Sequence, residues 1–284
     1  MQTVCSWSKI YSMEIEQIRF VVFLGIFLLM LVLESVIQRH PTVDSKKTRL
    51  KINLGLTGID ILAVRLVFGA AAVAAAQFAG ENGWGLFNYL DWPEWIEIIA
   101  VIIFLDLMIY IQHILVHVIP FFWQFHVVHH SDLDLDVSSG LRFHPIEILG
   151  SMLFKIGLVF ALGPSTLAVV VFEGILNGMA LFSHSNITLP EKLDRILRFV
   201  VVTPDMHRIH HSIEKMETNA NFGFNLSIWD RFLGTYIQEA KKEQPEIILG
   251  VDQFRTSEEL SLKNLLLMPF KAIPKNYSLF PGKD

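Results

Sequence analysis

Cysteine is almost absent from this chain of 284 residues, which contains only Cys5. A single thiol excludes an intrachain disulfide and a metal cluster built on thiolates, so any metal must be held by nitrogen and oxygen ligands. Charge is also scarce, because only 18% of the residues are Asp, Glu, Lys or Arg, and the net charge is -5. That balance gives no indication of a nucleic-acid partner.

Apolar residues, in contrast, make up 52% of the sequence, and the mean hydropathy is +0.45. Such a composition is typical of a protein with several membrane spans. Nearly unbroken apolar runs lie at 20–37, 52–78, 96–119, 146–162 and 165–182. A span takes about 20 residues, so the last two runs, separated by Gly163 and Pro164, either cross the bilayer or dip into it as a hairpin. We expect an all-α integral membrane protein, a bundle of about four to five transmembrane or re-entrant helices.

The loops between these runs differ in charge. The segment 39–51 has one acid, Asp44, and five cations: Arg39, Lys46, Lys47, Arg49 and Lys51. The segment 80–94 has three acids, several aromatic residues and no cation. By the positive-inside rule, the first loop is cytoplasmic and the second is external. This topology brings the histidine-rich segments to the cytoplasmic face, where we expect a helical cap on the bundle.

Smaller features lead to further expectations. Asp60 and Arg65 lie inside an apolar run, where a structural ion pair is expected. Thr203, Pro204 and Asp205 together form a helix-start signal. The segment 256–270 predicts a capped amphipathic helix that lies on the membrane or packs beneath the bundle. We divide the chain into an N-terminal segment (1–19), N-terminal spans with the basic loop (20–100), a catalytic domain (101–240) and a C-terminal tail (241–284).

Histidines recur at helical spacing in three places. His126, His129 and His130 lie at i, i+3 and i+4, and the pattern returns at His207, His210 and His211. Those offsets place three imidazoles on one helical face, and chance predicts roughly 0.02 copies of such a run in this composition. One apolar run also carries a polar stripe at i, i+4, i+7 and i+11, formed by Asp106, Tyr110, His113 and His117. Topology brings His184 to the same side.

Eight to ten histidines exceed the capacity of one metal ion and suit two neighbouring ions. Neutral nitrogen donors suit iron, zinc or copper. At a membrane surface, such a pair suits activation of O₂ and attack on an unactivated C–H bond of a lipid. A non-enzymatic membrane metal-binding protein or metal transporter is the alternative, although transporters bind ions near the bilayer midplane. A haem protein, a third option, would need histidine pairs on facing helices.

These motifs resemble the fatty acid hydroxylase/sterol desaturase superfamily over about 106–236. The matching elements are His113-x-x-x-His117, His126-x-x-His129-His130, Arg142-Phe-His144-Pro145-x-Glu147, His184-Ser-Asn186 and Thr203-Pro204-x-x-His207-x-x-His210-His211. The resemblance implies a membrane-bound di-iron oxygenase that hydroxylates or desaturates a sterol, fatty acyl chain or ether lipid. It implies two iron ions, with zinc possible in a resting or purified form, and O₂ as a co-substrate.

The resemblance also implies roles for individual residues. Eight metal ligands are His113, His117, His126, His129, His130, His207, His210 and His211, with His184 a ninth. His144 is either a further ligand or, beside Pro145, a residue that shapes the loop. Polar residues expected to orient the imidazoles are Asp106, Tyr110, Asn186, Asp205, Asn225 and Asp230. No cytochrome segment is visible in the sequence, so we expect an external electron donor: a b-type cytochrome, a ferredoxin or a reductase.

Overall fold

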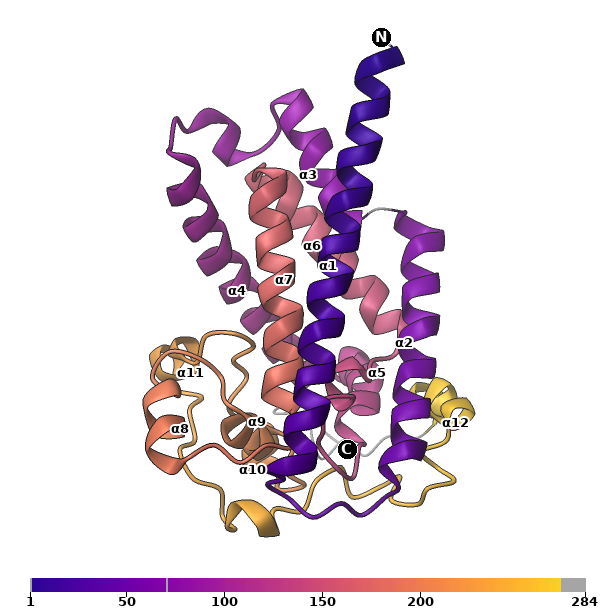
Figure 1. Cartoon of the computed structure of the whole chain (residues 1–284). Helices are drawn as coiled ribbons and strands as arrows, with labels where there is room; N and C mark the ends of the chain where they lie inside the picture. Colours follow the sequence, from indigo (N-terminus) through magenta and orange to yellow (C-terminus); the bar gives the residue numbers. More distant parts are fainter. Residues whose placement is uncertain (1, 70, 272–284) are drawn as a thin grey trace.

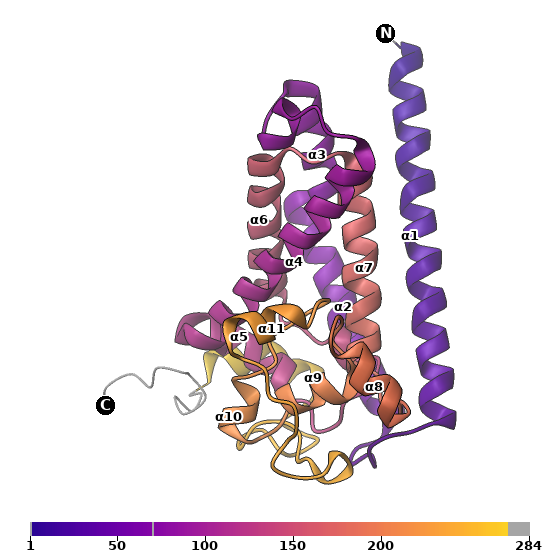
Figure 2. The ribbon, with the colours of Figure 1, turned by 90° about the vertical axis from the view of Figure 1, so that its left-hand side faces the viewer.

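The computed structural model describes residues 2–69 and 71–271, and all named elements of regular structure in these segments are helical. Long helices run roughly side by side, and short helices gather at one end of them (Figures 1 and 2). The long helices are α1 (Gln2–Val36), α2 (Lys46–Phe68), α3 (Ala71–Asn82), α4 (Glu94–Val118), α6 (Pro145–Leu162) and α7 (Thr166–His184). The shorter helices are α5 (Pro120–His130), α8 (Glu191–Leu197), α9 (Pro204–His210), α10 (Lys215–Thr218), α11 (Ile228–Leu233) and α12 (Leu262–Leu267), with single 3₁₀ turns at Leu86–Tyr89, Ser139–Leu141, Gln244–Glu246 and Met268–Phe270.

Five segments are long and apolar enough to cross a membrane, which confirms the all-α membrane fold. They are Gln17–Val36, Lys46–Tyr89, Glu94–Val118, Pro145–Leu162 and Thr166–His184. The predicted span at 52–78 falls within Lys46–Tyr89 and is divided between two helices, because α2 ends at Phe68 and α3 begins at Ala71. Gly69 stands at the break with φ +62°, a conformation that side chains disfavour. The predicted turn at Gly163 is confirmed, since this residue caps α6 in the left-handed conformation.

The helix-start signal before the last histidine cluster is also confirmed. Thr203 is the N-cap of α9, its hydroxyl accepts the Met206 N–H at 3.4 Å, and Pro204 occupies the first turn. Because a proline at this position lacks only an N–H that the helix would leave unpaired, the helix begins here without cost. The cap thereby fixes the direction in which His207 and His210 project.

Helices α1 and α2 brace the loops that follow the histidine segments. In α1, the buried Glu34 carboxylate accepts the backbone N–H of Val137 at 2.6 Å and that of Asn186 at 2.9 Å. In α2, Arg49 binds both carboxylate oxygens of Asp132, at 2.9 and 2.8 Å, and Asp136 at 2.6 Å. Arg49 is therefore a buried structural cation as well as a member of the basic segment 39–51.

The expected Asp60–Arg65 ion pair does not form between these residues. Residues five apart on an α-helix lie about 140° apart around its axis, so the two side chains face different directions. Arg65 is exposed, whereas Asp60 is buried and feels the charge of Glu147 in α6. The buried acid of α2 thus faces the neighbouring helix.

The C-terminal helix is shorter than predicted. In the segment 256–270 only α12 and one 3₁₀ turn form, because Thr256 and Glu259 close a separate turn by bonding each other reciprocally. The tail packs against the bundle, since Leu265 and Met268 are fully buried in one cluster with Leu56. Packing beneath the bundle is therefore the alternative that the structure supports.

Candidate metal centre

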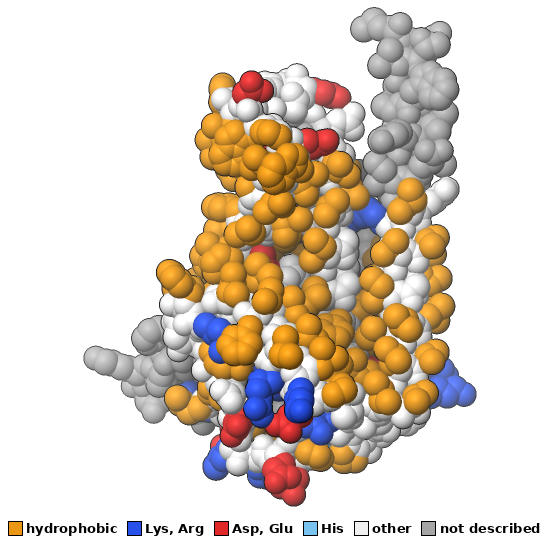
Figure 3. All heavy atoms as spheres, turned by 60° about the vertical axis from the view of Figure 1, so that its left-hand side comes forward, with side chains coloured by type: hydrophobic (Ala, Val, Ile, Leu, Met, Phe, Trp, Pro, Cys, Tyr) orange, Lys and Arg blue, Asp and Glu red, His pale blue; other side chains and the backbone are white. Residues whose placement is uncertain are grey.

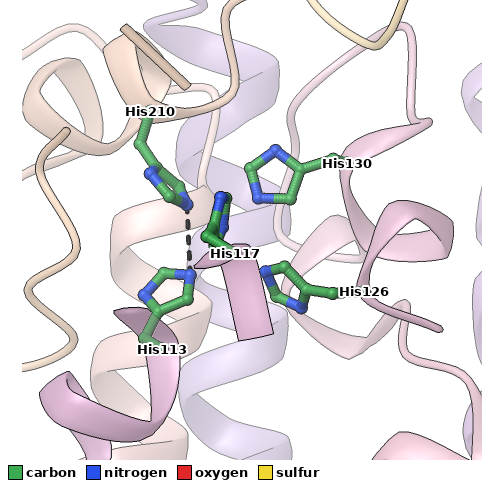
Figure 4. Close-up of side chains that lie close together, drawn as sticks. All are labelled: His113, His117, His126, His130 and His210. Atoms are coloured by element: carbon green, nitrogen blue, oxygen red, sulfur yellow. Dashed lines mark hydrogen bonds between the residues drawn. The ribbon is translucent and has the colours of Figure 1, made fainter. Parts of the chain in front are cut away.

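Nine of the predicted ligand histidines converge in two adjoining groups. The first group contains His113 and His117 from α4, His126 and His130 from α5, and His210 from α9; the second contains His129, His184, His207 and His211. Within each group, the ligand nitrogens lie within 4.8 Å of one another. Figure 4 shows the five rings of the first group turned toward a common centre. The rings of His130 and His211 stack with centroids 4.5 Å apart, which places the groups side by side.

The distances between ring nitrogens fit metal coordination. The Nε2 atoms of His113 and His210 lie 3.1 Å apart, and those of His184 lie 3.1 Å from His129 and 3.0 Å from His207. Two nitrogens bound to one metal at about 2.1 Å are about 3.0 Å apart at a right angle and about 3.4 Å apart in a tetrahedron. The observed distances are therefore compatible with neighbouring ligands around an ion.

Buried ring nitrogens without a partner support the same interpretation. Among the described residues, no hydrogen-bond partner is found for either ring nitrogen of His117, or for Nε2 of His126 and His130. Leaving a buried polar atom without a partner costs about 1–3 kcal/mol. A metal ion that accepts these lone pairs would remove the cost, so the donor set fits two ions.

Backbone carbonyls on the far side of the rings fix which nitrogen faces inward. The Nδ1 atoms of His113, His184 and His210 each lie 2.8 Å from a carbonyl oxygen, which belongs to Phe222, Ala180 and Ala220 respectively. A ring that donates Nδ1–H to a carbonyl presents the lone pair of Nε2 to the other side. His129 is oriented in the same way, since its Nδ1 lies 3.2 Å from the Arg142 carbonyl oxygen, so backbone carbonyls set four of the nine rings to present Nε2 inward.

Burial keeps the imidazoles of the short helices neutral. Desolvation, reinforced by neighbouring imidazoles, holds the pKa values of His129, His130, His207 and His211 well below the usual range. Burial also lowers the pKa of His210 to about 3, although the Ala220 carbonyl opposes the shift. At neutral pH these rings retain the lone pairs that metal binding requires.

His144 lies outside both groups. Its Nδ1 accepts the Ile146 N–H at 3.2 Å as the N-cap of α6, and its Nε2 lies 3.3 Å from the Leu266 carbonyl oxygen. Of the two roles left open for this residue, the structure shows the one that shapes the loop before Pro145.

Three of the predicted orienting residues hold the loop that supports His113. Asp230 accepts the backbone N–H groups of Phe222 and Gly223, both at 2.7 Å, and Tyr110 reaches Asp230 through the hydroxyl of Thr235. Asp106 accepts the backbone N–H groups of Asn225 and Leu226, each at 3.2 Å. These residues act on the cage through the backbone, because the Phe222 carbonyl is the partner of His113.

Asn186 and Asp205 connect the cage to the N-terminal segments. The Asn186 side chain bonds the backbone N–H and carbonyl of His40, both at 2.9 Å. Asp205 in α9 forms ion pairs with Arg39 at 2.9 Å and with Arg208 at 2.5 Å. Their role here is to hold the cap against the loop between α1 and α2.

Glu147 was not among the predicted site residues, yet it touches a ligand histidine directly. Its Oε1 lies 2.6 Å from Nδ1 of His126 and accepts a hydrogen bond from Nδ1–H, which leaves the lone pair of Nε2 free to face the centre of the first group. The signal was present in the sequence, since Glu147 belongs to the same short motif as His144. The carbonyls of Phe222, Ala180 and Ala220 had no such signal, because any residue supplies one.

The fold and the cage together define a helical protein with membrane-spanning segments and two adjoining groups of buried histidines that could hold metal at one end of its spans. The fatty acid hydroxylase family model matches residues 98–235. The chain is therefore similar to the fatty acid hydroxylase family over that segment, which confirms the resemblance seen in the histidine motifs.

Curated relatives extend the likeness. An ornithine lipid hydroxylase from Rhizobium tropici is 33% identical over 163 residues, which are 55% of this chain and 46% of that protein. An alkylglycerol monooxygenase from Xenopus tropicalis is 27% identical over 76% of this chain and 47% of its own length. A cholesterol 25-hydroxylase from Homo sapiens is 25% identical over 49% and 50%, respectively. The chain spans about half the length of these relatives, and no solved structure matches it significantly.

Proposed function

We propose that this protein is a membrane-bound di-iron oxygenase that hydroxylates a C–H bond of a lipid, using O₂ and electrons from an external donor. The observation that carries the proposal is the pair of adjoining groups of five and four buried histidines. Iron suits such a set, because imidazole nitrogens bind Fe²⁺ and the only cysteine is Cys5. Bound as a pair, the ions would supply the activation of O₂ that attack on an unactivated C–H bond requires.

The chain's own part in this chemistry is to hold the ligands and to exclude water. His113 is 7% exposed and the other eight rings are 2% exposed or less. The Phe143 ring stacks on His129 at a centroid distance of 4.3 Å, and Phe222 packs against His117 at 5.1 Å. Apolar walls of this kind protect a reactive centre from solvent.

We place the cage on the cytoplasmic face. The basic loop between α1 and α2 lies against the short helices, as the Arg39–Asp205 ion pair and the contact of His40 with the Ile247 carbonyl at 2.9 Å illustrate. By the positive-inside rule, the cage then shares the side of this loop. A cytoplasmic position gives an external b-type cytochrome, ferredoxin or reductase access to the cap.

The substrate class follows from the setting and from the relatives. A cage at the end of apolar spans is suited to a carbon of a membrane lipid, and the named relatives act on an ornithine lipid, alkylglycerol or cholesterol. We favour hydroxylation over desaturation, as in the names of these relatives. Alkylglycerols, ornithine lipids and sterols are the first substrates to test.

Metal analysis of the purified protein tests the cage. We expect about two ions per chain, and fewer in His117→Ala, because both nitrogens of that ring lack another partner. His144→Asn is the matched control, since asparagine also serves as an N-cap, and it should retain both ions. One ion or fewer in the wild type, with no change in His129→Ala, would contradict the two-metal site.

A second measurement tests the reaction. Lipid extracts from cells with and without the gene should differ by a species carrying one additional oxygen atom, and the product should require O₂. A species lacking two hydrogens would instead indicate desaturation. A protein that binds two ions but changes no lipid would favour the non-enzymatic alternative.

A further inference from the structure

Two of the short helices present large apolar side chains to the outside. At the end of α8 and in the turn that follows it these are Ile196, Phe199 and Val200, and in α11 they are Phe232 and Leu233. Phe232 is 85% exposed and Ile196 is 66% exposed. We call these five residues the shoulder patch. A contiguous apolar surface is unfavourable in water, so the position of the shoulder patch relative to the membrane matters.

The shoulder patch is one continuous surface because its two parts are joined. The Arg231 guanidinium lies 5.0 Å from the centroid of the Phe199 ring and 3.7 Å from that of Tyr236. The backbone N–H of Ser227, directly before α11, donates to the Val200 carbonyl at 3.0 Å. The end of α8 and the start of α11 therefore hold each other in place.

The position of α11 along α4 places the shoulder patch beside a candidate membrane span. The Trp229 indole N–H donates to Asp106 at 2.8 Å, and Asp106 lies twelve positions before Val118, where α4 ends. At 1.5 Å per residue, this is about 18 Å along the helix. Thus α11 lies beside a stretch well inside the candidate span Glu94–Val118. Ile103 and Phe104, in the turn before Asp106, are exposed apolar residues of that span.

Two arginines, Arg195 and Arg231, lie beside the shoulder patch. The Arg195 side chain is 69% exposed and forms an exposed ion pair with the carboxylate of Glu191 at 2.5 Å. In Figure 3, apolar side chains continue from the long helices down to the short ones, with Lys and Arg side chains below and between them. An apolar surface bordered by arginines matches the acyl and phosphate layers of a lipid leaflet.

We propose that the shoulder patch lies in the adjoining lipid leaflet, with its apolar side chains among the acyl chains and with Arg195 and Arg231 at the lipid phosphates. The protein would then contact the bilayer through the short helices as well as through its spans. One consequence rests on the proposed function. Lipid beside Asp106 would lie seven residues from His113, which is about 10 Å along α4.

A spin-label experiment on the full chain tests this placement. Phe232→Cys is made in a Cys5→Ser background, labelled with a nitroxide and reconstituted in vesicles of phosphatidylcholine and phosphatidylglycerol. The matched control is Met216→Cys in α10. Met216 is 77% exposed, and α10 lies at the end of the molecule away from the long helices (Figures 1 and 2). Both positions are exposed, so neither label disturbs the core.

In the vesicles, we expect the label at position 232 to collide with O₂ at least several-fold more, relative to a water-soluble nickel chelate, than the label at 216. Equal accessibility to the chelate at both positions would overturn the proposal. Protection of position 232 from both relaxants would also overturn it, because a protein would then cover the shoulder patch. Neither readout depends on bound metal or on lipid oxidation, so the proposed function is tested separately.

The arginine contribution has its own measurement. Spin-labelled phosphatidylglycerol should be retained at the protein surface more than spin-labelled phosphatidylcholine, and Arg195→Gln should reduce that preference. Lys215→Gln, which removes an exposed charge from α10, should leave it unchanged. If wild type and Arg195→Gln preferred phosphatidylglycerol over phosphatidylcholine equally, Arg195 would not contact the lipid phosphates.

Discussion

Replacing Arg49 by methionine is expected to destabilise the protein strongly, although Arg49 lies outside the histidine segments. Its guanidinium binds Asp132 through two hydrogen bonds and Asp136 through one, and it also reaches the Asp134 carbonyl and the Ser139 hydroxyl. The side chains of Arg49 and Asp132 are 5% and 2% exposed, so solvent does not screen the pair.

The magnitude follows from what methionine leaves behind. Asp132 and Asp136 would remain buried without their principal cation, and removing one partner of a buried ion pair costs about 3–5 kcal/mol. Taking about 2–4 °C per kcal/mol for a chain of this size, the midpoint of thermal unfolding should fall by roughly 6–20 °C. Because Asp132 follows His130 by two residues, bound metal should fall as well.

Thermal unfolding in detergent, followed by tryptophan fluorescence, measures the effect. Lys47→Met is the control. Lys47 lies two residues before Arg49 and is exposed, so the substitution removes the same charge without leaving a buried partner. Asp132→Asn and the double variant complete a cycle, in which the two substitutions should be strongly non-additive. The reasoning fails if Arg49→Met and Lys47→Met unfold within a degree of each other, or if the cycle is additive.

Three other perturbations test the cage. Glu147→Gln keeps the shape of the acceptor for His126 but removes its charge, so metal affinity should fall about 10–100-fold in a chelator competition; an unchanged affinity would deny Glu147 an orienting role. Gly140→Ala would place a methyl group 2.8 Å from the Ala180 carbonyl oxygen and 3.3 Å from Nδ1 of His184, so it should lower metal content, whereas Gly157→Ala, with open space around it, should not. In metal-depleted protein, His210 has a folded-state pKa of about 3 against 6.5 for an ordinary histidine, so the unfolded chain binds more protons between these values. The free energy of unfolding should therefore rise from about pH 3 to about pH 6.5, and a flat profile across this range would contradict the assigned burial.

The sequence by itself determined the class of fold and all nine histidines that meet in the two groups. Apolar runs of about 20 residues require helices wherever water is absent, because only a helix satisfies its own backbone within one segment. Helical spacing then placed each histidine triplet on one face. The ninth histidine, His184, could be assigned because topology brought the end of its span to the same side as the others.

Only the tertiary structure decided how these histidines divide and what holds them. The triplet in α5 is split, with His126 and His130 in the first group and His129 in the second, because the two ions would lie on either side of one helix face. His144 caps the start of α6 and lies outside both groups. A spacing rule fixes directions within one helix, but grouping depends on where the other helices stand.

The remaining surprises were interactions between segments distant in the chain. Asp60 faces α6 and not Arg65, and Arg49 is a buried partner of Asp132 as well as a member of the basic segment 39–51. The carbonyls that orient His113, His184 and His210 come from residues whose side chains play no part. Local sequence determines a helix and its faces, because those depend on neighbours in the chain. The partners of buried charges and ring nitrogens depend on packing, which the sequence encodes only through the whole fold.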